Sequence, residues 1–448
     1  MSFPFVTLTA ARHSTTHFFR RTRLAVLASV LSLLSFNLLA ADGTLTLGEA
    51  QQLAVARSRQ LAAQDLAVRA SRDMAVAAGQ LPDPVLKLGI DNLPVSGQDR
   101  LSLTQDFMTM RRIGVMQEIT RADKRQLRAA RYERAADKSL AEKSMAIATI
   151  QRDTAMAWLE RYYAEQMAAV VTEQAIQAKL EIQTAEAAYR AGRGSQADIF
   201  AARSALALVE DRASEFERRV LNAKTMLARW TGDAASGALA GQPTIDTIRL
   251  DLANLDSSLA HHPQIAILAR QSDIAEADAK LALANKKTDW TVEVAFQQRG
   301  PAYSNMVSVG ISVPFQWDQK NRQDRELSSK LAMVEQAKAE REEMLRAHVA
   351  ETRSMINEWQ NGRERSSRYQ NELIPLAVSR TEASLAAYRG GKASLAELLI
   401  ARRNEIDVRL QALQLQADTA RLWAQLNFLF PLDAQDLHSA STMNQDTQ

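Results

Sequence analysis

Two regions of this chain alternate apolar and polar residues with period two, the pattern of a β-strand that has one apolar face. In the first region, apolar residues occupy positions 86, 88 and 90, and a less regular alternation follows at 106–119. The second region shows the pattern at 291–297 and again at 307–313. Pro94, Ser96 and Gly97 separate the first pair, and Gly300 and Pro301 the second. The pattern predicts two strand–turn–strand units.

Most of the remaining chain has the composition of very long helices. Residues 115–191 contain neither glycine nor proline and are rich in strong helix formers. Seventy helical residues would extend about 105 Å. A second stretch at 318–388 is interrupted only at Gly362 and Pro375, where we expect the helix to break. Shorter helices are predicted at 47–78, 195–230, 264–286 and 394–430, and six helices of this kind predict coiled-coil-like packing.

The first 41 residues have the pattern of a cleaved signal peptide. Arg20, Arg21 and Arg23 precede an apolar run at 24–40, and small residues follow at Ala40 and Ala41. The alternative is an uncleaved membrane anchor, for which this run is short. The mature chain would then begin near residue 42, outside the cytoplasm. The sequence has no second run of 18 apolar residues, so a membrane location would have to be reached through strands.

Composition narrows the class of protein. The 448 residues are 46% hydrophobic and 24% charged, as in folded proteins, and only 16 glycines and 10 prolines leave little room for loops. The net charge of +3 arises from interleaved acids and bases, so nothing indicates a nucleic-acid partner. The absence of cysteine excludes disulfides and cysteine metal sites.

The predicted strands carry aliphatic and aromatic residues on one face and polar or small residues on the other. This is the apolar-out, polar-in pattern of a transmembrane barrel. Trp290, Phe315 and Trp317 stand at strand ends, where an aromatic girdle would lie. Four strands are too few to close a barrel, but several copies could pool their strands. The alternative is a water-facing sheet or a soluble sandwich.

The chain is internally duplicated. "AYRAGRGSQAD" at 188–198 returns as "AYRGGKASLAE" 199 residues later, and Arg203 matches Arg402. Each half reads helix, strand, strand, very long helix, glycine turn, shorter helix. We therefore divide the chain into a signal peptide at 1–41, a first repeat at 42–230, an equatorial linker at 231–255, a second repeat at 256–431 and a flexible tail at 432–448.

The recurring turns are predicted to lie together at one end, roughly 100 Å from the strands. Gly192 and Gly391 suit the left-handed position that ends a helix. Helix reversal alone explains these glycines, and helix capping explains part of the recurrence of the acids. The recurring tyrosines and basic residues instead favour a docking and gating tip. The predicted tip residues are Tyr189, Arg190, Ala191, Gly192, Arg193, Ser195, Asp198, Tyr388, Arg389, Gly390, Gly391, Lys392, Ser394 and Glu397.

Taken together, these features resemble the TolC family of outer-membrane efflux proteins, from residue 45 to residue 430. The duplication carries the resemblance, and the segments "GVMQEITRADKR" and "VGISVPFQWDQKNR" are most similar to the heavy-metal branch of the CusC and CzcC type. Many relatives in that branch have a lipid-bearing cysteine at the mature N-terminus, which this chain lacks. The expected fold is mainly α with a small β part, built from long coiled-coil-like helices and four strands.

The resemblance implies a homotrimer that pools its strands into one twelve-stranded outer-membrane β-barrel, continued by a periplasmic α-barrel. The glycine turns would form the closed periplasmic end. A periplasmic adaptor, or membrane fusion protein, would dock there, and an inner-membrane pump of the resistance-nodulation-division type would supply the substrate. The family has an apolar residue where this chain has Arg193 and Lys392, so we expect a more electrostatic adaptor contact.

The sequence carries no motif that we recognise as catalytic or as binding a cofactor, and we expect no enzyme, no cofactor and no resident metal. His261 and His262 precede Pro263, which favours a helix start over a metal site. Strand methionines favour packing over metal contact, and they stand at Met108, Met110 and Met116. The expected function is a passive export duct for small toxic solutes, either heavy-metal cations or drugs. The alternatives are the outer-membrane duct of a type I protein secretion system and a periplasmic coiled-coil adaptor or scaffold.

Overall fold

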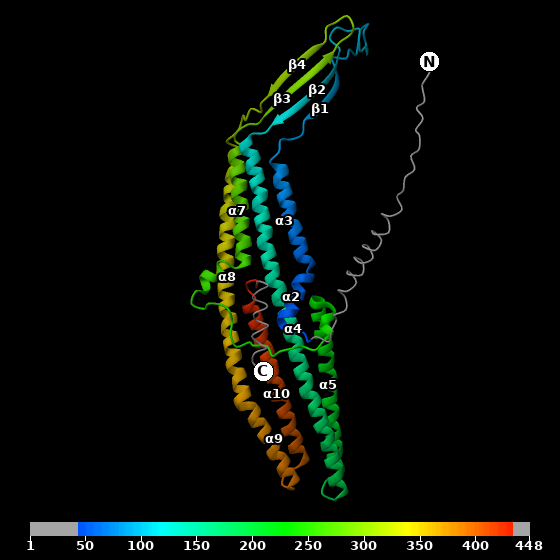
Figure 1. Cartoon of the computed structure of the whole chain (residues 1–448), viewed down its shortest axis with the longest axis vertical. Helices are drawn as coiled ribbons and strands as arrows, with labels where there is room; N and C mark the ends of the chain where they lie inside the picture. The colour runs from blue at the N-terminus through cyan, green and yellow to red at the C-terminus, as the bar shows by residue number, and fades with distance from the viewer. Residues whose placement is uncertain (1–43, 433–448) are drawn as a thin grey trace, which may run out of the picture.

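The computed structural model describes residues 44–432 as one elongated molecule, with a β-sheet at one end and two helical turns at the other (Figure 1). The predicted signal peptide and residues 433–448 of the predicted tail lie outside this range. The strands are β1 (Val85–Asp91), β2 (Met110–Ile119), β3 (Trp290–Gln298) and β4 (Met306–Ser312). The helices are α2 (Leu47–Arg57), α3 (Arg59–Ala78), α4 (Ala122–Arg190), α5 (Gln196–Thr231), α6 (Leu255–Leu259), α7 (Pro263–Ala284), α8 (Gln323–Arg368), α9 (Ile374–Arg389) and α10 (Leu395–Asn427), with the short helices η1 (Gly232–Ser236) and η2 (Tyr369–Leu373).

Each strand continues one helix, and strands and helices have the same order across the molecule (Figure 1). The sheet is antiparallel with the order β1-β2-β3-β4, and next to it α3, α4, α7 and α8 pack side by side in the matching order. In the half away from the sheet, α5 packs on α4, and α10 packs between α4 and the α8–α9 helix. The two repeats therefore form one layer, in which the second helical hairpin extends the first.

Several predicted boundaries were wrong for identifiable reasons. The helix expected at 47–78 is two helices, because Ser58 leaves helical geometry and its side chain caps α3 at Leu61. Strand β2 begins at Met110 and not at residue 106, because Asp106 caps a turn by accepting hydrogen bonds from the amides of Met108 and Thr109.

The second very long helix also differs from its prediction. Gly362 lies inside α8 and does not break it. The residue is glycine because α10 passes so close that a Cβ at this position would lie 2.4 Å from Thr419 Oγ1. Pro375 does perturb the helix, but through a π-helical turn at Tyr369–Leu373 that lets the chain continue into α9. A π-turn widens the helix just where proline removes a backbone donor.

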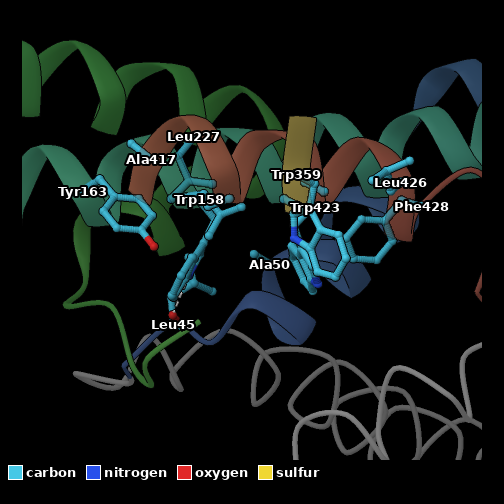
Figure 2. Packing of buried hydrophobic residues seen from close by; sticks show 14 of the residues in the cluster. Leu45, Ala50, Trp158, Tyr163, Leu227, Trp359, Ala417, Trp423, Leu426 and Phe428 are labelled. Carbon is cyan, nitrogen blue, oxygen red and sulfur yellow. Dashed lines mark hydrogen bonds between the residues drawn. The ribbon is translucent and has the colours of Figure 1, made fainter. Parts of the chain in front are cut away.

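The main hydrophobic core lies at mid-height and holds the segment that connects the repeats (Figure 2). Three buried tryptophans donate their indole N–H to backbone carbonyls of extended segments: Trp158 to Leu45, Trp359 to Ile245 and Trp423 to Thr247. Their rings occupy the core while their polar edges hold the chain that wraps around it. This geometry gives the equatorial segment a fixed path, although the exact domain boundaries stay a prediction.

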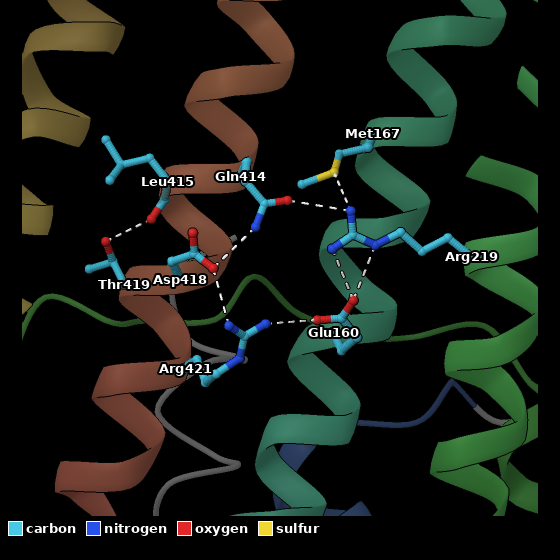
Figure 3. A network of polar contacts seen from close by, with 8 residues as sticks. All are labelled: Glu160, Met167, Arg219, Gln414, Leu415, Asp418, Thr419 and Arg421. Carbon is cyan, nitrogen blue, oxygen red and sulfur yellow. Dashed lines mark hydrogen bonds and ion pairs between the residues drawn. The ribbon is translucent and has the colours of Figure 1, made fainter. Parts of the chain in front are cut away.

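Polar contacts join the same helices beside this core (Figure 3). Glu160 of α4 accepts from Arg219 of α5 at 3.1 Å and from Arg421 of α10 at 3.3 Å. Gln414 of α10 also accepts from Arg219, at 3.3 Å. These groups are partly exposed, so each pair contributes little to stability. Their effect is to fix the register of α4 against both of its neighbours.

Candidate functional site

One face of the sheet is apolar and faces outward. Leu86, Val115, Val294 and Val309 are aligned across the four strands, and a second row of apolar residues lies beside them. The four named residues are 47% to 69% exposed, far more than residues of a protein core. Contiguous exposed apolar surface of this kind marks a face that contacts another protein or lipid.

The opposite face is polar and closely packed. A Cβ at Gly114 would lie 2.8 Å from the Cβ of Ala295, so only glycine fits there. Glu293 accepts from Lys87 at 2.8 Å and forms an ion pair with Arg112. The two faces thus separate apolar from polar or small residues in β3 and β4. The separation is less regular in β2, where Arg111 lies on the apolar face and Met116 on the polar one.

The sheet has the height of a membrane-spanning band. Strand β3 has nine residues, which extend about 30 Å at roughly 3.3 Å per residue. Tilted by about 40°, it would cover about 23 Å, close to the roughly 25 Å apolar band of a transmembrane barrel. Within the described residues, β1 and β4 each pair on one side only, which leaves two open edges.

The predicted girdle aromatics lie at the helix-side end of the apolar face. Trp290 is the first residue of β3, whereas Phe315 and Trp317 follow the end of β4. Phe315 and Trp317 are 80% and 87% exposed, and their rings meet edge to face at 5.2 Å. Their role as a girdle stays a prediction.

The two glycine turns have the same geometry. Gly192 and Gly391 have φ values of +68° and +69°, and a Cβ there would meet nothing within 4 Å, so backbone conformation alone requires glycine. The amides of Arg193 and Lys392 donate back to the carbonyls of residues 188 and 387, at 2.9 and 2.8 Å. This is the Schellman pattern that ends a helix.

The predicted caps and acids also take structural positions. Ser195 and Asp198 form a reciprocal capping box at the start of α5. Ser394 caps α10 by accepting from the amide of Glu397 at 3.3 Å. The recurrence of these serines, and of Asp198, therefore follows from helix capping.

The basic residues of the tips do not cap helices, although Arg190 and Arg389 stand in the last turns of α4 and α9, where a cation favours the helix dipole. Arg190, Arg193, Arg389 and Lys392 are all exposed, and within residues 44–432 none of them forms an ion pair. Tyr189 is exposed, whereas Tyr388 packs against the apolar cluster between the hairpins. Burial, together with the negative charge of Asp198, raises the pKa of the Tyr388 phenol. The structure thus leaves the cations free for a partner, and their docking role stays a prediction.

Ion pairs that the sequence analysis did not assign join the two hairpins above the tips. Arg402 of α10 donates to Glu181 of α4 at 3.2 Å, and Arg212 of α5 binds Asp407 of α10 at 2.7 Å. Burial raises the pKa of Glu181 despite the adjacent Arg402. The match of Arg203 with Arg402 did not reveal this contact, because Arg203 binds Glu186 of its own hairpin, whereas Arg402 binds α4 of the other hairpin.

The histidines and methionines that were weighed as metal ligands lie at helix starts and in or next to β2. His262 is the N-cap of α7, and Pro263 is the first helical residue, as predicted. Met110 and Met116 lie in β2, whereas Met108 precedes the strand. In the part of the chain that the structure describes, no three His, Cys, Asp or Glu side chains are arranged to hold a metal ion. No helix there is long and apolar enough to cross a membrane.

Solved structures of outer-membrane proteins are similar to this chain over most of its length. The outer-membrane channel OprN has a TM-score of 0.72 at 16% identity, covering 87% of this chain and 90% of its own. VceC from Vibrio cholerae has 0.70 at 17%, with 86% and 95% covered, and CusC has 0.69 at 14%, with 86% and 92% covered. The chain has the fold of these outer-membrane proteins.

This likeness confirms the predicted fold class, a mainly helical duplicated protomer with a small sheet. The scores of the three structures are nearly equal, so they do not favour the heavy-metal branch over others. No protein-family model and no curated protein sequence matches the chain.

Proposed function

We propose that this protein is the outer-membrane channel of a tripartite efflux system, a non-enzymatic duct in the outer membrane of a Gram-negative bacterium. Three copies would pair their open β1 and β4 edges and form a twelve-stranded barrel around a water-filled pore. The apolar face would contact lipid, and the face that carries Lys87, Arg112 and Glu293 would line the pore. The helices would continue the duct into the periplasm.

The observation that carries this proposal is the sheet. It exposes an apolar face about as tall as a membrane, has a charged opposite face, and is open at both edges. A soluble sandwich would cover its apolar face, and a coiled-coil scaffold would have no need of one. The likeness to the channels OprN and CmeC of Campylobacter jejuni supports the same conclusion.

The tips would dock a periplasmic adaptor that connects the duct to an inner-membrane pump of the resistance-nodulation-division type. Their four unpaired cations would bind acidic residues of that adaptor, while the ion pairs of Arg402 and Arg212 hold the hairpins together. Opening of the duct then requires the hairpins to move apart. Small toxic solutes, either heavy-metal cations or drugs, would be the cargo. The similarity of "GVMQEITRADKR" and "VGISVPFQWDQKNR" to the heavy-metal branch favours metal cations.

Charge reversal at the tips tests the docking role. Arg193→Glu combined with Lys392→Glu should lower efflux-dependent resistance at least tenfold while trimers remain intact, because adaptor acids would meet like charge. The matched control is Arg218→Glu with Arg365→Glu. These two exposed cations lie elsewhere on the same two repeats and form no ion pair with any residue of 44–432. Unchanged resistance in the tip variant, with normal amounts of trimer, would refute a charged docking tip.

The cargo is tested by deleting the gene and measuring resistance to a panel of metals and drugs. Selective sensitivity to metal cations would assign the heavy-metal branch, and sensitivity to drugs would assign a drug efflux system. A secretion defect for one polypeptide without altered resistance would favour the type I secretion duct.

A further inference from the structure

The sheet-to-helix junction of the second repeat combines exposed aromatics with exposed cations. Phe315 and Trp317 follow the end of β4, are 80% and 87% exposed, and continue in sequence the odd-numbered apolar positions of that strand. Trp290, the first residue of β3, lies on the apolar face opposite Ile119, at the helix-side end of the sheet. Aromatic side chains at the edge of an apolar band mark the level of the lipid headgroups.

Three cations follow these aromatics within eight residues: Lys320, Arg322 and Arg325. All three are exposed, and within residues 44–432 none forms an ion pair. Of the neighbouring acids, Asp324 is bound to Lys286 at 2.8 Å, and Asp318 accepts from Asn321 at 3.0 Å. The third acid, Glu326, is exposed.

The corresponding junction of the first repeat is different. Arg121 takes the place of Trp317 in the repeat and binds Asp123 at 3.2 Å. Lys124 is buried and binds Asp289 at 2.8 Å. These two cations of the first junction are therefore paired with acids, whereas Lys320, Arg322 and Arg325 form no ion pair within residues 44–432. The first junction lies inside the layer, between α3 and α7, whereas the second lies at the open β4 edge.

We propose that Lys320, Arg322 and Arg325, below Phe315 and Trp317, bind the phosphate headgroup of an anionic glycerophospholipid in the leaflet that faces the helices. This site rests on the proposed function, because the sheet must lie in the membrane. The aromatic rings occupy the interface, and the long basic side chains extend back to the phosphates from the start of α8. A zwitterionic lipid lacks the net charge that these cations would select.

Quenching of tryptophan fluorescence by brominated lipid measures this selection. The full protein is reconstituted as a trimer in vesicles of dibrominated phosphatidylcholine mixed with unbrominated phosphatidylglycerol or phosphatidylcholine. The difference between wild type and Trp317→Phe isolates the signal of Trp317. Unbrominated lipid that occupies the site relieves the quenching. We expect phosphatidylglycerol to compete about fivefold better than phosphatidylcholine at low salt, and less at high salt.

Three variants separate charge from shape. In K320Q/R322Q/R325Q the two lipids should compete equally well, so the preference for phosphatidylglycerol should fall to about onefold. K320R/R322K/R325K keeps the charges and should keep the preference. R346Q/R365Q/R368Q removes three exposed cations further along α8 and should leave the preference unchanged.

Two results would overturn the site. Equal competition in the wild type, or an undiminished preference in the glutamine variant, would show that these cations do not select the lipid. Both results leave the proposed channel intact, because Trp317 is still quenched by lipid. A Trp317 that no brominated lipid quenches would instead refute the membrane position of the sheet, and with it both proposals.

Discussion

A pair of buried histidines at mid-height illustrates how single residues depend on their surroundings. The ring of His262 lies 4.2 Å from that of His348 and 5.6 Å from that of Phe430. Burial, with contributions from His348 and the positive charge of Arg152, lowers the pKa of His262 to about 4. Burial also lowers the pKa of His348, against the opposing effect of Glu351.

The lowered pKa values predict a loss of stability in mild acid. The folded protein keeps His262 neutral, whereas an unfolded chain takes up a proton below a pH of about 6.5. Stability contributed by the neutral ring is therefore complete above that pH and is lost as the pH falls toward about 4. Between pH 7 and 5 this loss should reach about 2 kcal/mol.

Replacing His262 with asparagine tests this sign. Asn at this position can still accept from the amide of Gln264 as an N-cap, but it does not titrate. Thermal unfolding followed by circular dichroism at both pH values should show a smaller acid-induced loss in His262→Asn than in the wild type. Carboxylates titrate in both proteins, so the difference isolates the histidine. Equal losses in the two proteins would contradict the prediction.

Elements were predictable where the pattern was long, and were missed where a distant contact decided the outcome. The glycine-free stretch at 115–191 predicted the existence and the end of α4, although α4 begins only at Ala122. The alternation predicted the existence of all four strands, although β2 begins four residues later than expected. Gly362 was wrongly predicted to break the helix, because the reason for a glycine at this position is the nearby Thr419 on a different helix. The ion pair of Arg402 with Glu181 joins residues 221 positions apart, which no local pattern reveals. The turns at Gly192 and Gly391 were predictable, since their cause is local.

The contact between α8 and α10 gives an element-scale prediction. Alanine is normally favoured over glycine inside a helix by about 1 kcal/mol. In Gly362→Ala the new methyl would instead collide with Thr419, so we expect a net loss of about 1–3 kcal/mol.

Denaturant unfolding of the single and double variants forms a cycle that isolates this clash. Thr419→Ala removes the nearest atom, so Gly362→Ala should cost far less in the Thr419→Ala background than in the wild type. An equal cost in both backgrounds would show that Thr419 is not the obstacle. Gly390→Ala is the control, since a Cβ there meets nothing closer than 3.4 Å, and it should cost little.

At the scale of the whole molecule, each strand of the sheet extends a helix of the layer below it. The apolar face of the sheet therefore continues into one and the same face of the helical layer along the length of the protein. Sequence alternation predicted which residues share a face, but it could not distinguish a lipid-facing sheet from one covered by protein. The exposure of the apolar rows shows that no part of residues 44–432 covers this face, and its contact with lipid remains the proposal.

Two neighbouring residues of β4 test which face meets lipid. Val309 lies in an apolar row and is 69% exposed, whereas Ser308 lies on the polar face, in the row of Ala295. An arginine at the membrane midplane costs about 2–4 kcal/mol on a lipid face, but much less in a water-filled lumen. Because each chain of a trimer would carry the substitution, the cost is incurred three times.

Val309→Arg should therefore abolish heat-modifiable trimers in the outer-membrane fraction, and Ser308→Arg should leave most of them. The two substitutions introduce the same side chain at adjacent positions of the same strand, so the added charge is matched. If both variants assemble normally, the apolar face does not contact lipid, and a soluble scaffold becomes the better interpretation. If both fail, an arginine anywhere in β4 disrupts the sheet itself. Loss in the valine variant alone identifies the apolar rows as the membrane surface of the molecule.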